Sequence, residues 1–101
     1  MNLGESIMEI VVIPQEQVAE ALAKHIGSQI RLSNVTKSGA YRTFLFENEI
    51  EEGPVSEKSK LVWDILAKDE ERHSCPGYRR VTYATTRFFN IEGENIQYRV
   101  K

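Results

Sequence analysis

With 101 residues, of which 41% are hydrophobic and 28% charged, the chain is long enough for one domain with a modest core and too apolar for a disordered protein. A formal net charge of -2, from 13 Lys and Arg against 15 Asp and Glu, argues against wholesale electrostatic attachment to nucleic acid or to an anionic membrane. One cysteine, the lack of a bilayer-length apolar run and the lack of a cleavable leader make the cytoplasm the expected compartment. We expect residues 1–101 to form a single domain, with 1–6 as a loose terminus.

The first half of the chain predicts a strand, a helix and a hairpin. Residues 7–13 (IMEIVVI) are a β-branched apolar run, which is typical of a buried central strand. The runs 29–35 and 40–47 flank the turn sequence TKSG and predict a β-hairpin. Between these elements, a helix over 15–26 that stops at Gly27 is predicted from apolar residues at helical spacing: Val18, Leu22 and Ile26.

An acidic loop and a second helix are predicted next. The loop covers 48–55, and the helix covers 56–72 with Ser56 as its N-cap. Its inward stripe is predicted to comprise Leu61, Val62, Ile65 and Leu66. The Cys-Pro-Gly sequence at 75–77 cannot continue a helix and ends it.

The last two predicted strands pair around the sequence EGEN, with 78–91 forming the longer one. Setting Ile91 opposite Ile96 places Phe89 opposite Tyr98, so that one face of the hairpin is apolar. The predicted order is β-α-β-β-α-β-β, an α+β fold with the split βαβ, ferredoxin-like pattern and one additional C-terminal strand. We expect a mainly antiparallel sheet with two helices packed on one face.

The sequence lacks the residue sets that familiar enzyme classes need. Cys75 has His73 two residues away, but Val81 stands where a cysteine phosphatase requires its arginine. A zinc site needs about four Cys or His ligands, and the chain offers only these two residues and His25. Glycine-rich phosphate loops and a Ser/His/Asp set are also missing from the sequence. We therefore expect a protein that is not an enzyme, with no catalytic residue, metal site or cofactor.

Charge is unevenly distributed along the chain. Nine acidic residues and three lysines lie between Glu47 and Glu71, whereas the last 26 residues hold five basic and two acidic residues. The run ENEIEE at 47–52 lacks calcium-loop spacing, so it is either a solvated loop or an acidic surface that faces a partner. Trp63 falls beside the apolar stripe of the predicted second helix, where a half-exposed tryptophan is either an interface anchor or a lid over the core edge. The candidate protein-binding residues are Trp63, Glu47, Glu49, Glu51 and Glu52.

Arginine alternates with aromatic residues near the end of the chain, which favours a nucleic-acid-binding sheet as the alternative function. Strand alternation directs Arg80, Thr86 and Phe88 away from the helices. The other reading of this pattern is a solvated strand face. The candidate nucleic-acid residues are Arg79, Arg80, Arg87, Phe88 and Arg99.

AYRTFLFENE, residues 40–49, resembles a segment of a small anti-CRISPR protein family that inhibits type II-C Cas9 nucleases, in which a Tyr-Arg-x-Phe-Leu-Phe strand precedes acidic and amide residues. The resemblance extends to ALAKHI in the first helix and to the ending RFFNIEGENIQYRVK. It implies a stoichiometric inhibitor that binds a nuclease and has no active site. It also adds Arg42, in the matched strand, to the candidate protein-binding residues.

The leading hypothesis is therefore a small non-enzymatic interaction protein, encoded by a phage or mobile element, that binds a protein partner such as a host nuclease. A homodimer through an open sheet edge is a second expectation, because the additional C-terminal strand leaves an edge available for pairing.

Overall fold

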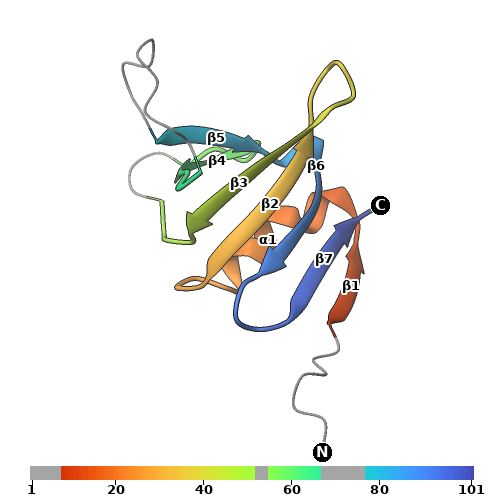
Figure 1. The fold of residues 1–101 in the computed structure, drawn as a ribbon, viewed down its shortest axis with the longest axis vertical. Coiled ribbons are helices and arrows are strands. Elements are labelled where there is room, and N and C mark those ends of the chain that lie inside the picture. The colour runs from red at the N-terminus through yellow and green to blue at the C-terminus, as the bar shows by residue number, and fades with distance from the viewer. Residues whose placement is uncertain (1–7, 52–54, 67–76) are drawn as a thin grey trace, which may run out of the picture.

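The computed structural model describes residues 8–51, 55–66 and 77–101, which form an α+β fold of seven strands and one α-helix (Figure 1). Five strands make one sheet in which β1 runs parallel to β7 and every other neighbouring pair is antiparallel. In spatial order these strands are β1 (Glu9–Ile13), β7 (Ile96–Val100), β6 (Thr86–Ile91), β2 (Gln29–Val35) and β3 (Tyr41–Glu47).

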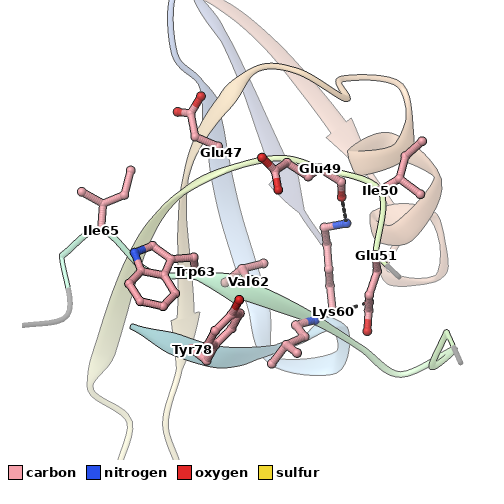
Figure 2. A pocket seen from close by; sticks show the side chains of 10 residues that line it. Glu47, Glu49, Ile50, Glu51, Lys60, Val62, Trp63, Ile65 and Tyr78 are labelled. Atoms are coloured by element: carbon pink, nitrogen blue, oxygen red, sulfur yellow. Dashed lines mark hydrogen bonds between the residues drawn. The ribbon is translucent and has the colours of Figure 1, made fainter. Parts of the chain in front are cut away.

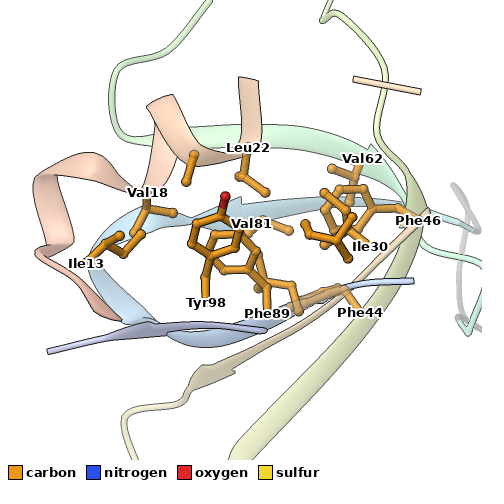
Figure 3. Packing of buried hydrophobic residues seen from close by; sticks show 13 residues of the cluster. Ile13, Val18, Leu22, Ile30, Phe44, Phe46, Val62, Val81, Phe89 and Tyr98 are labelled. Carbon is orange, nitrogen blue, oxygen red and sulfur yellow. The ribbon is translucent and has the colours of Figure 1, made fainter. Parts of the chain in front are cut away.

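The second layer consists of the helix and a small antiparallel sheet. A 3-10 turn (Gln15–Gln17) leads into α1 (Val18–Ala23), which lies across one face of the large sheet (Figure 1). Beside it, β4 (Ser59–Trp63) pairs with β5 (Tyr78–Thr82). The core fills the space between these layers, with Leu22 of α1 and Val62 of β4 facing Phe89 and Ile30 of the large sheet (Figure 3).

Asn48 joins the end of α1 to the end of β3. It is fully buried, and its Nδ2 donates to the backbone oxygens of Leu22 at 2.7 Å and of His25 at 3.0 Å. Its own backbone oxygen accepts from Gly27 N–H, which follows the helix at a φ of +96°. One side chain thus adds a hydrogen bond to each of two carbonyl groups at the helix end, which also accept from His25 N–H and Ser28 N–H.

Both predicted hairpins are confirmed. Residues 29–35 pair with 41–47, and Ile91 lies opposite Ile96 with Phe89 opposite Tyr98. The register follows the alternation of apolar residues, because a shift by one position would turn the apolar set toward water.

The predicted second helix is wrong for residues 59–63, and the ferredoxin-like order is not confirmed. These residues are strand β4, in which Lys60 and Val62 point inward while Leu61 and Trp63 point outward. A short apolar run fits both a helical and a strand period, and pairing with the β5 sequence YRRVT decides between them. The rest of the predicted helix, from residue 67 onward, and the turn at 75–76 lie outside the described residues.

The first strand lies at an edge of the sheet and not at its centre. It pairs with β7 on one side only, and Ile10 and Val12 are exposed on the face away from α1. The prediction failed because a β-branched run reports strand propensity, whereas position in the sheet depends on which partners the rest of the chain provides.

The long strand predicted over 78–91 is two strands joined by a 3-10 turn (Tyr83–Thr85). The Thr86 hydroxyl donates to the backbone oxygen of Thr82 at 2.9 Å, and its side chain is buried. The register of β6 with β2 shifts at this point and leaves Arg87 in a bulge. The prediction that Thr86 faces outward is wrong for this reason.

Asn48→Ala is expected to lower the free energy of unfolding by about 2–3 kcal/mol, because it removes two buried hydrogen bonds from the end of α1. Denaturant unfolding measures the change. Asn90→Ala is the matched control, since Asn90 is only half-buried and accepts one bond from Gln97. Equal losses in the two variants would contradict a special role for Asn48.

Tyr98→Phe is expected to reduce the pH dependence of stability in alkali. Burial, helped by Glu9 and Glu94, raises the pKa of Tyr98 above its usual value of 10.0. The unfolded chain therefore loses this proton first, so the stability that neutral Tyr98 provides is complete below pH 10 and falls as the pH rises past it.

The advantage of the wild type over Tyr98→Phe, which includes a 2.8 Å hydrogen bond to His25 Nε2, should shrink between pH 8 and about pH 11. Tyr83, whose pKa burial also raises, is present in both proteins and cancels from the comparison. A difference in unfolding free energy that stays constant with pH would contradict the expectation.

Candidate functional site

A groove of about 540 Å³ lies between β4 and the chain that leaves β3 (Figure 2). Residues 47–51, called the arch below, pass over β4 and form one wall of the groove. Trp63 and Tyr78 lie on the other wall. The remaining lining comes from β4 and the residues around it: Lys60, Leu61, Val62 and Ile65.

The edge of β4 that faces away from β5 is a row of backbone groups. Tyr83 N–H donates to Lys58 O and Asp64 N–H donates to Gly77 O, which fixes the register of the antiparallel ladder. In this register the N–H and C=O groups of Leu61 and Trp63 point away from β5. Leu61 N–H donates to Glu51 Oε1, whereas the backbone groups of Trp63 have no partner among the described residues, so a partly open strand edge borders the groove.

Lys60 holds the arch in place. Its side chain crosses the gap, and Nζ donates to the backbone oxygen of Glu49 at 2.6 Å (Figure 2). The residue is only 9% exposed, and burial lowers the pKa of Lys60 although the carboxylates of Glu51 and Glu49 oppose that effect. Glu51 ties the far end of the arch to β4 by accepting from Leu61 N–H at 3.4 Å.

The aromatic wall is exposed but well positioned. Trp63 is 52% exposed and Tyr78 is 54% exposed, and their rings meet edge to face with centroids 4.8 Å apart. The indole lies over Gly77, where a Cβ atom would come within 2.7 Å of the ring. Gly77 also has a φ of +96°, so both the close approach and the backbone conformation require glycine.

The opposite wall carries negative charge. Glu47 and Glu49 are exposed, and Glu47 Oε2 accepts from Gln29 Nε2 at 2.9 Å. Glu51 is less accessible, since Arg80 Nη1 lies 3.8 Å from its carboxylate. The groove thus sets two exposed carboxylates against two exposed aromatic rings (Figure 2).

Four of the predicted protein-binding residues meet in this groove: Glu47, Glu49, Glu51 and Trp63. Trp63 is half exposed as expected, although it lies on a strand. Arg42 does not line the groove; its guanidinium carbon lies 5.4 Å from the centre of the Phe44 ring. Glu52 lies outside the described residues.

The predicted nucleic-acid residues do not share one surface. Arg79 and Arg80 lie on β5, where Arg80 also donates to Ser59 Oγ. Arg87 lies in the bulge and donates to the backbone oxygens of Ala84 and Thr86. Phe88 and Arg99 lie opposite each other in the large sheet. The set is thus divided between two sheets.

Sequence reasoning did not assign Lys60 and Tyr78 to a binding site, although they line the groove, and it missed Gly77, over which the Trp63 ring lies. The alternation in SKLVW and YRRVT was the available signal, because two such strands pair Trp63 with Tyr78. Assigning the first of them to a helix hid that pair.

Metal and membrane sites find no support among the described residues. These residues contain no cluster of three or more His, Cys, Asp or Glu side chains suited to a metal. His25 instead contacts Tyr98 and, at 3.5 Å, Glu94. Cys75 and His73 lie outside the described ranges, and within those ranges no helix is long and apolar enough to cross a membrane.

Gly77→Ala is expected to displace the Trp63 ring and to lower the free energy of unfolding by about 1–3 kcal/mol, through the clash and the left-handed backbone. The chain has one tryptophan, so its fluorescence emission reports on this ring alone. Gly39→Ala is the matched control, because Gly39 has a φ of +90° and no atom within 4 Å of an added Cβ. We expect a loss of stability in both variants and a shift of emission only in Gly77→Ala; an unchanged emission there would contradict the packing.

Comparison with known proteins leaves the groove to be judged on its geometry. No protein-family model matches the chain. Neither the curated proteins nor the solved structures contain a match.

Proposed function

We propose that the protein is a non-enzymatic interaction protein that binds a protein partner through the groove between β4 and the arch. The observation that carries this proposal is Trp63, which is half exposed yet held against Tyr78 and over Gly77 at a partly open strand edge. Tryptophan is the residue most enriched among the side chains that dominate binding energy in protein interfaces. A rigid aromatic side chain also loses little conformational entropy when a partner covers it.

A nuclease is the first partner to test. The segment 40–49 that resembles type II-C anti-CRISPR proteins covers β3 and the start of the arch, and it includes Glu47 and Glu49 of the groove. This overlap supports an inhibitor that acts by occupying a nuclease surface, encoded by a phage or mobile element. The protein would then work at a one-to-one ratio with its target in the cytoplasm.

A nucleic-acid-binding sheet is the second candidate. On the large sheet Phe88 lies opposite Arg99, and its ring centre is 5.9 Å from that of Tyr41. An arginine beside two aromatic rings suits stacking with bases. We rank this candidate second because Arg79 and Arg80 lie on the other sheet.

The C-terminal strand β7 lies between β1 and β6, so the expected open edge is not there, and we propose self-association through β1 in its place. The outer edge of β1 has no strand beside it among the described residues, and Ile10 and Val12 are exposed. An unprotected edge strand with apolar side chains is a template for pairing with another chain.

Trp63→Ala is expected to lower the recovery of a specific partner at least about 30-fold, the effect of losing an interface residue worth 2 kcal/mol or more. The protein, tagged at either end, is used for affinity capture from lysate of the cells that produce it. In a second measurement, the protein is mixed with purified type II-C Cas9 and DNA cleavage is measured.

Tyr41→Ala is the matched control, because Tyr41 is an exposed aromatic residue of β3 that lies outside the groove. Wild-type binding by Tyr41→Ala together with loss in Trp63→Ala supports the groove. Loss in Tyr41→Ala with retention in Trp63→Ala overturns the groove in favour of the sheet face. Lysate proteins retained equally by all three proteins would overturn both sites.

A further inference from the structure

We propose that the groove binds an extended segment of the partner that carries an arginine, with the segment's backbone added to β4 and its guanidinium held between the aromatic and acidic walls. This inference rests on the proposed function and assigns the chemistry of the occupant.

The backbone part follows from the ladder register. Leu61 and Trp63 direct N–H and C=O groups away from β5, and the residues 45–51 that pass beside β4 do not form a strand ladder with it. Two hydrogen bonds of the β4 edge to the segment are already made, since Ile65 N–H donates to Leu45 O and Leu61 N–H donates to Glu51 Oε1, and Lys60 Nζ also reaches across to Glu49 O. The N–H and C=O groups of Trp63 are left for an added strand among the described residues. An extended peptide is the occupant that supplies matching donors and acceptors to such an edge.

The size of the groove suits a short segment. Its volume of about 540 Å³ lies within the range of roughly 300–1,000 Å³ that ligand sites occupy. Trp63 and Tyr78, which border the groove, are each about half exposed, so a bound segment can reach solvent on that side.

The charge of the groove selects a cation. Glu47 and Glu49 present exposed carboxylates, and Arg80 lies near only the third one, Glu51. Lys60 is the cation of the groove itself, but its Nζ is buried and donates to Glu49 O. A phosphate or carboxylate ligand would therefore meet two negative groups, which argues against nucleic acid as the occupant.

Arginine suits the two walls better than lysine. A guanidinium is planar, so one face can lie on an indole or phenol ring while its edge donates to a carboxylate. It is also less strongly hydrated than an ammonium ion and loses less on entering a half-buried site. Figure 2 shows the carboxylates of Glu47 and Glu49 on the side of the groove opposite Trp63 and Tyr78, which is the arrangement that such a side chain requires.

The test uses blocked heptapeptides of sequence Ac-Thr-Val-Thr-Xaa-Thr-Val-Thr-amide, where Xaa is arginine, lysine or citrulline. Citrulline keeps the planar shape of arginine without its charge. Binding to the full chain is followed by the emission of Trp63, the single tryptophan. We expect saturable binding of the arginine peptide, with citrulline at least about 10-fold weaker because a charged contact is lost. Lysine should be about 3-fold weaker, because its ammonium group is more strongly hydrated and cannot stack on a ring.

Two further arms separate charge from backbone pairing. Glu49→Gln should weaken the arginine peptide about 10-fold and leave the citrulline peptide unchanged, whereas Glu16→Gln, an exposed carboxylate outside the groove, should change neither. Methylating alternate backbone nitrogens of the arginine peptide removes strand donors and should weaken binding at least about 10-fold.

Equal binding of the arginine and citrulline peptides overturns the claim that the groove selects the charge of arginine. Full binding of the methylated peptide overturns strand addition. No saturable change in emission up to about 5 mM overturns the whole inference. If one of these results is obtained and Trp63→Ala no longer binds the partner, the proposed function stands and only this inference is overturned. If Trp63→Ala still recovers the partner, the proposed function and this inference are both overturned. Dissociation of a dimer of this chain by the arginine peptide would place a second copy in the groove and overturn a separate partner.

Discussion

The hydrogen bonds from the buried Asn48 amide to the end of α1 are the constraint on which the rest of this structure depends. They fix where the helix stops relative to β3, and so fix the space between the large sheet and α1 in which the core packs. The two carbonyl acceptors also determine which way the amide points, since only its nitrogen can donate to them. Its Oδ1 is left buried without a partner among the described residues, a cost that the two bonds and the buried helix end must offset.

One wall of the groove is formed by the chain that follows Asn48. Because Asn48 is held by the helix, the chain that follows it must leave β3 and cannot continue as a strand beside β4. The arch is a consequence of that departure, and Lys60 keeps it at a set distance from β4 through Glu49 O. A buried amine in this position acts as a spacer, so the carboxylates of the arch remain available to solvent. The acidic wall is therefore a product of the same contacts that stabilise the fold.

The hairpins could be read from the sequence because both depend on local alternation and a short turn. The groove could only be read in part. Exposure of Trp63 and the acidity of 47–52 are properties of single positions, and these predictions named four side chains that line the groove. Their meeting depends on β4 pairing with a strand that starts 15 residues after it ends, and no local pattern encodes that pairing. The run at 59–63 fits two periods, and only its distant partner YRRVT favours the strand. The edge position of β1 was missed for the same reason, because its neighbour β7 is the last of the described strands in sequence order.

The pairing of β1 with β7 also constrains how the protein is made. Glu9 pairs with Ile96, so β1 has no partner in the large sheet until β7 and the residues between the two strands have been synthesised. Contacts between residues so far apart in sequence form slowly, because a long loop must close before they reward it. During that interval Ile10 and Val12 belong to an unpaired apolar strand, the kind of segment that misassembles with other nascent chains. The five-stranded sheet is therefore completed only when its first and last strands in sequence order meet.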